Sequence, residues 1–237
     1  MTSVQEYYNQ QWSSSGQDMF ALAFKEAIAH SYFLLDELKD RKLLEIGCGS
    51  GEQAIYFSSQ GAEVTVIDIS VGSLKAAQQS AEKKGVTLTA MQMDAQQLQF
   101  PDESFDLIYI NSTLMHVDQQ KVLQECSKVL KKGGKLVIVE PLQYAPFVQL
   151  YRLCGSYRKM KPRYATFKMF TEGKKYFTSF EHKEFYLFSS LLLPVFYFRN
   201  YFLHGIYRGV AKFDAALIKV FPFLRYGCWV GVGRYGK

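Results

Sequence analysis

Three glycines spaced two residues apart stand directly after a short apolar segment. The segment Leu43–Ile46 leads into Gly47, Gly49 and Gly51. Glycine permits positive φ angles and lets a ligand touch the main chain where a Cβ would collide, and a helix that begins there presents free N–H groups. An apolar strand followed by this loop and a helix therefore predicts a cofactor-binding site.

An aspartate ends the next apolar segment along the chain. Val64–Asp68 predicts a second strand that ends in a carboxylate, 17 residues after Gly51. In an α/β sheet this is where an acidic side chain meets a ribose. The dinucleotide fingerprint GxGxxG requires a small residue at position 52, where this chain has Glu52. The spacing therefore argues against a nicotinamide-dependent dehydrogenase.

The chain resembles the class I S-adenosylmethionine-dependent methyltransferases in five motifs, which occur in the family's order. They are Glu45 with the three glycines, Asp68, Met93–Ala95, Phe105–Asn111 and Val129–Pro141. An ordered series is far more specific than any one motif. The resemblance is to the ubiquinone/menaquinone biosynthesis and small-molecule natural-product methyltransferase group. It predicts a cofactor-binding core over residues 41–141.

The resemblance implies S-adenosyl-L-methionine as the methyl donor. The residues expected to bind it are Glu45, Gly47, Gly49, Gly51, Asp68, Ile69, Asp94, Ala95 and Asn111. The glycines approach the amino acid portion and the ribose, and Glu45 supports the loop and the donor's ammonium group. Asp68 takes the ribose hydroxyls, Asp94 and Ala95 meet the adenine, and Ile69 packs on its ring. In isolation, Asp68 would be a helix cap and Asp94 a solvated loop carboxylate.

The segment Asn111–Val117 follows the fourth expected strand, where the family places its acceptor. His116 in this segment could take a proton from a hydroxyl as the methyl group arrives, and a structural hydrogen bond is the alternative. The segment lacks the [N/D]PP[Y/F] motif of enzymes that methylate nucleobase or glutamine amides. Related enzymes fold an N-terminal segment over the donor, so Tyr7, Tyr8 and Trp12 are candidate lid residues, with core packing as the alternative.

Length and composition predict one domain over residues 1–237. A chain of 237 residues with 48% hydrophobic content can bury a full core. The four cysteines stand singly, at positions 48, 126, 154 and 228, so neither a disulfide framework nor a metal site is expected. The N-terminus lacks the basic-then-apolar order of a signal peptide, and a cytoplasmic location is expected.

The charge is divided unevenly along the chain. Residues 1–140 contain 12 Lys and Arg against 18 Asp and Glu, whereas residues 141–237 contain 16 against 4. The second part also contains 25 of the 37 aromatic residues. Interleaved basic and aromatic residues suit a membrane surface or an anionic or aromatic ligand, and composition alone does not choose among these.

Strand and helix patterns alternate through the first part of the chain. Helices are expected at 18–38, near 51–60, after Ser70 and at 118–130, and strands at 63–68, 86–92, 105–110 and 134–140. Two last strands are expected at Phe180–Tyr186 and Tyr226–Arg234. The fold class is α/β: a doubly wound, Rossmann-like, mostly parallel seven-stranded sheet with a C-terminal antiparallel strand. Residues 142–225 form a helical, aromatic-rich insertion over the crevice, with residues 145–180 helical.

Two segments of the insertion favour contact with an anionic membrane. Phe185–Phe198 is the most hydrophobic stretch, yet its 14 residues are too few to span a bilayer. A basic amphipathic helix is expected near 205–220, with one apolar face formed by Ile206, Val210, Phe213, Leu217 and Val220. A lid, a buried acceptor pocket or a dimer surface is the alternative.

The sequence is consistent with three functions from different classes. The leading one is methyl transfer to a small lipophilic or aromatic acceptor, with oxygen favoured as the target and carbon next. The second is methylation of a nucleic acid or a protein held by the basic C-terminal half, although a nucleic acid is the less favoured partner. The third is a scaffold that binds the donor without turnover. The sequence does not define the acceptor or the oligomeric state.

Overall fold

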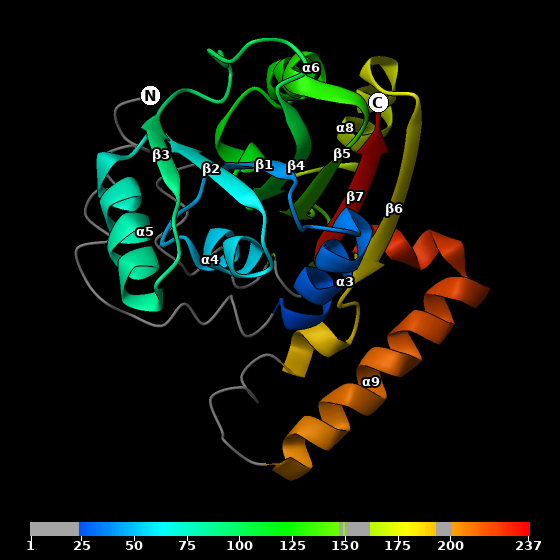
Figure 1. Ribbon diagram of the computed structural model, residues 1–237. Helices are drawn as coiled ribbons and strands as arrows, with labels where there is room; N and C mark the ends of the chain where they lie inside the picture. The colour runs from blue at the N-terminus through cyan, green and yellow to red at the C-terminus, as the bar shows by residue number, and fades with distance from the viewer. Residues whose placement is uncertain (1–23, 147–148, 150–161, 193–200) are drawn as a thin grey trace.

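The computed structural model describes residues 24–146, 149, 162–192 and 201–237. Seven strands form one sheet in the order β3-β2-β1-β4-β5-β7-β6 (Figure 1). They are β1 Lys42–Ile46, β2 Glu63–Asp68, β3 Thr89–Gln92, β4 Phe105–Asn111, β5 Leu130–Pro141, β6 Ser179–Phe185 and β7 Val230–Gly236. Strands β1 to β5 are parallel to one another, and β7 is antiparallel to both β5 and β6.

Helices cover both faces of this sheet. They are α3 Lys25–Leu35, α4 Glu52–Ser59, α5 Val71–Lys84, α6 Gln119–Val129, α8 Phe167–Gly173 and α9 Tyr201–Val220, with 3-10 turns η1 Leu114–His116, η3 Lys174–Tyr176 and η5 Pro222–Gly227. Side chains alternate across each strand, so Leu43 joins the core under α3, α4 and α5, whereas Leu44 joins the core under α6 and α8. The doubly wound fold class is confirmed.

Local signals fix where several elements begin and end. Ser70 caps α5, and its hydroxyl accepts a hydrogen bond from the Ser73 amide at 3.1 Å. Asp118 caps α6 in the same way, accepting from the Gln120 and Lys121 amides. Strand β2 has the predicted bounds, while β3 begins three residues later than expected and β5 extends back to Leu130.

The region after Pro141 differs from its prediction. Residues 145–180 were expected to be helical, but residues 162–166 form no helix, α8 has only seven residues and η3 three. The two expected last strands are present with shifted bounds: β6 is Ser179–Phe185 against the expected Phe180–Tyr186, and β7 is Val230–Gly236 against Tyr226–Arg234. They pair in register from Ser179 opposite Gly236 to Phe185 opposite Val230. Helix α3 occupies only part of the predicted 18–38, and residues 18–23 lie outside the described residues.

Helix α9 packs near the carboxyl end of β6 and extends away from the body (Figure 1). Its Tyr207 belongs to one core, while Leu217 and Ile218 pack against the other. Within the described residues, no helix is both long and apolar enough to cross a membrane. The same part of the chain contains no cluster of three or more His, Cys, Asp or Glu arranged to hold a metal ion.

Candidate functional site

The predicted donor residues gather at the carboxyl ends of β1, β2, β3 and β4. Parallel strands bring these ends to one edge of the sheet, where the ligand crevice of an open α/β fold lies. The glycine loop leaves β1 with its Gly47 amide donating to the Ile67 carbonyl at 2.8 Å, so the loop remains attached to β2. Gly51 then begins α4 as its N-cap, in the left-handed region at φ 79°.

Two of the three glycines face protein side chains. A Cβ on Gly47 would collide with the Thr113 side chain, and a Cβ on Gly51 would lie 2.8 Å from Cβ of Ala77 in α5. Both residues also have positive φ angles, 77° and 79°, which side chains rarely adopt. Close packing of the loop against β4's exit loop and α5 therefore requires glycine at both positions.

Asp68 holds the glycine loop and the start of the next helix. One carboxylate oxygen accepts from the Gly49 amide at 3.4 Å, and the other accepts from the Ser70 amide at 2.8 Å. Burial raises the pKa of this carboxyl above its usual value, and the Ser70 and Gly49 hydrogen bonds oppose that rise. Each oxygen has further acceptor capacity, so a hydroxyl donor can bind without displacing these amides.

Glu45 is a buried carboxylate one strand away. It is 1% exposed, and its Oε2 has no hydrogen-bond partner within the described part of the chain. Burial raises its pKa well above the usual value; a hydrogen bond from the Ala54 amide opposes this, and the Asp68 charge adds to it. A buried acceptor without a partner is costly, and a cationic ligand group would relieve that cost.

Of the expected adenine residues, Asp94 and Ala95 lie in the loop after β3, and Ile69 follows β2. Asp94 accepts from the Gln96 amide at 2.8 Å and from the Gln96 side chain at 3.2 Å, so its carboxylate stabilises the loop turn. Ala95 is buried in the core, and the Ile69 carbonyl accepts from the Gln92 side chain at 3.1 Å. The three residues lie at neighbouring strand ends, as the sequence predicted.

Glu140 is a site residue that the sequence analysis did not single out. It lies at the end of β5, is fully buried, and its Oε1 accepts from the Thr113 and Leu114 amides, each at 2.7 Å. Burial raises its pKa to about 8, and the hydrogen bonds of Leu114, Thr113 and Met115 oppose that rise. Its position offered a signal, because a carboxylate at the end of an apolar strand is what drew attention to Asp68.

His116 ends the 3-10 turn that Glu140 holds. Burial lowers the pKa of its imidazole to about 4, so the ring is neutral at pH 7. Asn111, at the end of β4, accepts from the Ser112 hydroxyl at 3.1 Å. Thr113 bridges β1 and β4, since its hydroxyl donates to the carbonyls of Ile46 or Asn111, at 3.2 and 3.0 Å. The acceptor-side loop is thus tied to the donor loop. Tyr7, Tyr8 and Trp12 lie outside the described residues.

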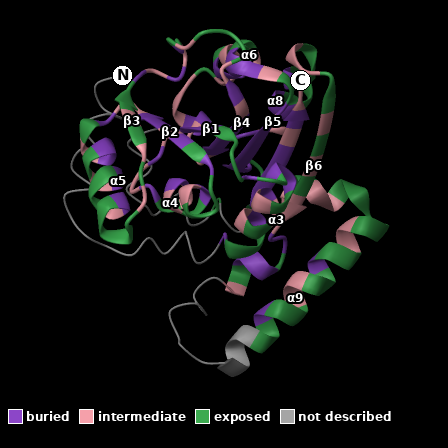
Figure 2. Cartoon of the chain, viewed as in Figure 1, coloured by how far each residue is buried: buried purple, intermediate pink, exposed green. Residues whose placement is uncertain are grey.

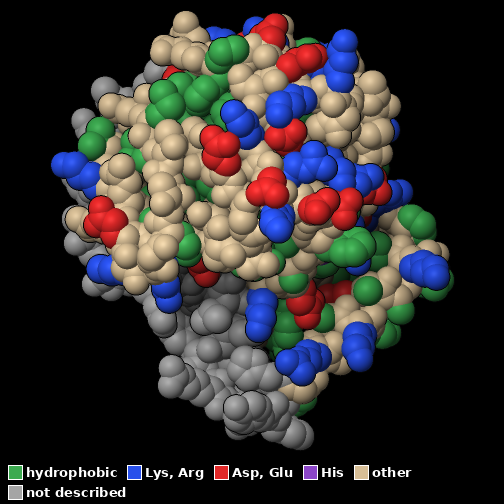
Figure 3. All heavy atoms as spheres, viewed as in Figure 1, with side chains coloured by type: hydrophobic (Ala, Val, Ile, Leu, Met, Phe, Trp, Pro, Cys, Tyr) green, Lys and Arg blue, Asp and Glu red, His purple; other side chains and the backbone are tan. Residues whose placement is uncertain are grey.

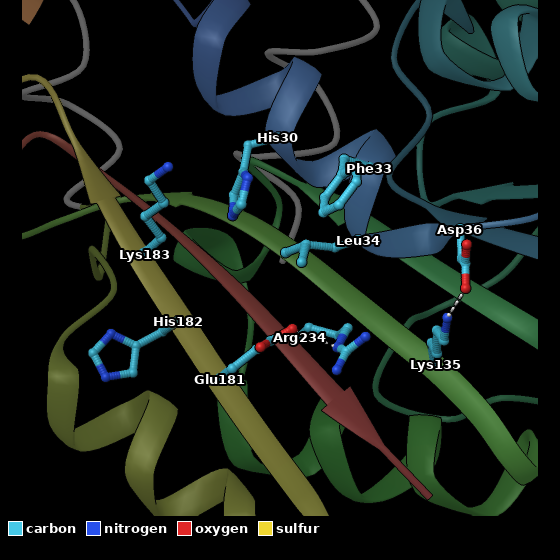
Figure 4. Close-up of a pocket in the computed structure, with 9 residues that line it drawn as sticks. All are labelled: His30, Phe33, Leu34, Asp36, Lys135, Glu181, His182, Lys183 and Arg234. Atoms are coloured by element: carbon cyan, nitrogen blue, oxygen red, sulfur yellow. Dashed lines mark hydrogen bonds and ion pairs between the residues drawn. The ribbon is translucent and has the colours of Figure 1, made fainter. Parts of the chain in front are cut away.

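A groove of about 560 Å³ lies elsewhere, between α3 and the strands β5, β6 and β7 (Figure 4). Four of its charged side chains form two ion pairs: Lys135 with Asp36 at 3.0 Å, and Arg234 with Glu181 at 2.7 Å. Lys135 lies five residues before Glu140 on β5, toward the opposite edge of the sheet from the crevice. This groove is therefore separate from the candidate site.

Comparison with known proteins gives the class of this fold and site. A family profile described as a methyltransferase domain matches residues 44–138. A ubiquinone/menaquinone biosynthesis C-methyltransferase from Pectobacterium carotovorum is 33% identical over 108 residues, which cover 43% of this chain and 43% of the relative. A demethylmenaquinone methyltransferase from Thermobifida fusca is 34% identical over 125 residues, 51% of this chain and 52% of that protein.

A solved structure shares the fold over most of the described chain. Phosphoethanolamine N-methyltransferase 2 from Haemonchus contortus, in complex with S-adenosyl-L-methionine, aligns with a TM-score of 0.63 and 18% identity, covering 88% of this chain and 52% of that one. The chain spans about half the length of the curated relatives it matches, or less. The family predicted from the motifs is confirmed: the chain carries a class I S-adenosylmethionine-dependent methyltransferase domain, whose cofactor is S-adenosyl-L-methionine.

Proposed function

We propose that the protein transfers a methyl group from S-adenosylmethionine to a small lipophilic or aromatic acceptor. The observation that carries the proposal is the buried Oε2 of Glu45, which has no partner in the described residues and lies on the strand that enters the glycine loop. The donor supplies an electrophilic methyl group on a sulfonium. The chain's own task is to hold two partners in line, which contributes about 7–11 kcal/mol in well-oriented reactions.

Each donor residue has a role that its contacts support. Glu45 binds the ammonium, Asp68 accepts from the ribose hydroxyls, and Gly49 brings its backbone close to the donor while its amide stays on Asp68. Ile69, Asp94, Ala95 and Asn111 surround the rest of the donor. The cofactor-binding core is residues 41–141 of a single domain, and residues 142–225 contribute the acceptor side.

His116 is the proposed proton acceptor. A base with a pKa of about 4 does not deprotonate a phenol in advance. It can still take the proton from an oxygen that is gaining a methyl group, because that oxygen becomes strongly acidic during the transfer. Oxygen is therefore the first target to test. Carbon is the second candidate target atom, since the Pectobacterium relative is described as a C-methyltransferase.

Calorimetry with S-adenosylhomocysteine tests the donor site. Asp68→Ala should weaken binding at least tenfold, because a charge-assisted pair of hydrogen bonds is worth about 1.5–3 kcal/mol. Asp68→Asn keeps one acceptor oxygen and should lie between wild type and Asp68→Ala. Asp102→Ala, at an exposed loop position, is the matched control. Unchanged affinity in a folded Asp68→Ala variant would reject the assignment.

Transfer of a radioactive methyl group to candidate acceptors tests the activity. Simple phenols, quinols and prenylated aromatics should be labelled, and mass spectrometry should place the label on oxygen or carbon. Labelling of RNA, DNA or protein instead would favour the polymer alternative. Tight donor binding with no transfer to any class would favour the scaffold.

The proposal includes a place in the cell. We propose a cytoplasmic enzyme that makes peripheral contact with an anionic membrane, where lipophilic acceptors accumulate. The net charge of +12 in residues 141–237 supports this contact.

A further inference from the structure

Helix α9 carries three separate stripes of residues along its length. An α-helix turns about 100° per residue, so residues seven apart lie nearly in line. Tyr207 and Asp214 form a buried stripe; Ile206, Phe213 and Val220 form an apolar stripe; and Arg208, Lys212 and Lys219 form a basic stripe. Only the first of these contacts the protein body through buried side chains, as the banding of α9 in Figure 2 shows.

The buried stripe fixes the helix by two polar anchors. Asp214 is 2% exposed and accepts from the amides of Leu187, Phe188 and Ser189 and from the Ser189 hydroxyl, at 2.7–3.1 Å. Tyr207 hydrogen-bonds Tyr186, whose hydroxyl accepts from the Ala27 amide of α3 at 3.0 Å. These anchors set the rotation of α9 about its own axis, so the other two stripes are held outward.

The apolar stripe remains exposed to solvent in the described structure. Ile206, Phe213 and Val220 are 44%, 57% and 67% exposed, and the stripe continues into Phe221 and Phe223 of the following turn, at 47% and 66%. The sequence predicted Val210 and Leu217 on the same apolar face, but these two are half-buried toward the body. A row of large apolar side chains held outward in this way marks an interaction site.

The exposed charges that α9 itself carries are all basic, with Glu26 of α3 lying near Arg208. Between Tyr201 and Gly227 the acidic residue is Asp214, which is buried, whereas Arg208, Lys212 and Lys219 are exposed. Figure 3 shows Lys and Arg side chains alternating with hydrophobic ones along this helix. A second copy of the chain would bring like charges together across such a face, and an anionic surface would not.

We propose that α9 and the turn Pro222–Gly227 form the surface by which this protein docks on an anionic lipid membrane. Ile206, Phe213, Val220, Phe221 and Phe223 insert between headgroups, and Arg208, Lys212 and Lys219 meet the lipid phosphates. Apolar insertion or surface charge alone gives weak attachment, and together their contributions add. The inference deepens the membrane contact of the proposed function and is independent of methyl transfer.

Sedimentation with vesicles tests the docking surface. Full-length protein should pellet with phosphatidylcholine–phosphatidylglycerol vesicles at low salt, and much less with phosphatidylcholine alone. Phe213→Ser should lower the partition coefficient roughly tenfold, as one large side chain leaves the lipid. Phe33→Ser, which removes an even more exposed aromatic from α3, is the control and should bind as wild type does.

Charge reversal tests the electrostatic part. Each lysine near an anionic surface is worth about fivefold in partitioning, so Lys212→Glu with Lys219→Glu should lower binding by well over tenfold. Lys83→Glu with Lys84→Glu, at the exposed end of α5, is the control of equal charge and should bind at least tenfold better than the α9 variant. High salt should reduce the vesicle binding of the wild type, and it should reduce the binding of the α9 charge variant much less.

Four outcomes would overturn the inference. They are the absence of wild-type binding to anionic vesicles at low salt, equal binding to neutral vesicles, equal losses in the α9 and control variants, and a dimer that Phe213→Ser dissociates while vesicle binding is unchanged. Binding of S-adenosylhomocysteine should be the same in every one of these variants. A loss of docking with donor binding intact therefore separates failure of this surface from failure of the methyltransferase assignment.

Discussion

Buried carboxylates lie in both halves of the chain, but their pairing differs. Around the crevice, Glu45 and Glu140 each have one oxygen with no partner among the described residues, and burial raises the pKa of both. Under α9, Asp214 accepts four hydrogen bonds from three backbone amides and one hydroxyl. A fully paired buried carboxylate fixes a structure, whereas one with an unused oxygen has capacity left for a ligand.

The regions around these buried carboxylates also differ in charge and in architecture. The crevice lies at the ends of parallel strands, where chain segments distant in sequence meet, and its charge excess is acidic over residues 1–140. The α9 region is basic and aromatic, and its polar groups serve to hold one helix against the body. The first half thus leaves buried carboxylate oxygens available to a ligand, whereas the second half uses its buried carboxylate to hold a helix.

The largest expected effect is on stability, from Asp214→Ala. Removing the carboxylate leaves three amides and a hydroxyl without their acceptor in a buried site, and the free energy of unfolding should fall by about 4 kcal/mol. Urea denaturation measures this, and Asp214→Asn should lose less because one acceptor oxygen remains. If the comparison is right, the affinity for S-adenosylhomocysteine stays unchanged in folded protein; a weaker affinity would mean that the two halves are coupled.

Glu140→Ala should have the next largest effect, on the opposite half. It leaves the Thr113 and Leu114 amides without an acceptor and creates a cavity, at a cost of about 3 kcal/mol. Glu140→Gln should retain most of the stability, because its carbonyl can accept both amides. Methyl transfer should follow the same order, since these amides set the position of the loop that contains His116.

The pH dependence of stability sharpens this test. The folded pKa of Glu140, about 8, is above the unfolded value, so the folded state binds more protons in between, and stability falls as pH rises from about 4.5 through 8. Between about pH 6 and pH 9 the loss from this group is about 2–3 kcal/mol. Glu140→Gln should show a flatter profile over that range. Identical profiles would indicate that Glu140 titrates normally.

The first half of the fold was predictable because its signals are local. Positive φ angles require glycine at the β1 loop, Ser70 caps its own helix, and alternating apolar residues mark strands with two buried faces. Asp68 was placed correctly at a strand end for the same reason. Glu140 was missed as a side-chain anchor because its partners, Thr113 and Leu114, are 27 and 26 residues away, and no local pattern records that contact.

The second half was less predictable because tertiary contacts decide it. Apolar spacing gave α9 an apolar face with Phe213 and Leu217 together, yet the anchors Tyr207 and Asp214 rotate the helix so that Phe213 is exposed and Leu217 half-buried. A single aspartate in a basic helix resembles a solvated residue in sequence. The long helix expected over residues 145–180 likewise failed, because residues 162–166 form no helix and α8 ends after seven residues.

A smaller effect is expected in the glycine loop, where backbone strain and side-chain packing can be separated. Gly51→Ala should cost about 2 kcal/mol, because a side chain at φ 79° is strained and its Cβ would lie 2.8 Å from Cβ of Ala77. Gly85→Ala is the matched control: φ is 67° and no heavy atom lies within 4 Å of the added Cβ, so only the strain of about 1 kcal/mol remains. In an Ala77→Gly background, Gly51→Ala should cost less than in the wild type, although the Ala77 Cα remains 3.0 Å from the added Cβ. Equal costs at both glycines would contradict close packing of the loop on α5.

The smallest expected effect concerns His116 and the sign of its pH dependence. Its folded pKa, about 4, is below the unfolded value, so the unfolded state binds more protons and stability falls as pH falls from about 6.5 toward 4. Between about pH 7.5 and pH 5.5 this should cost about 1 kcal/mol, which His116→Asn should remove. The difference between wild type and variant isolates this residue from His30, whose pKa is also lowered by burial. In kinetics, a proton acceptor with this pKa gives wild-type kcat no inflection near pH 6.5. An inflection there that His116→Asn abolishes would show that the imidazole is more exposed in the working enzyme, and would weaken the contrast between a buried acceptor side and an open α9 surface.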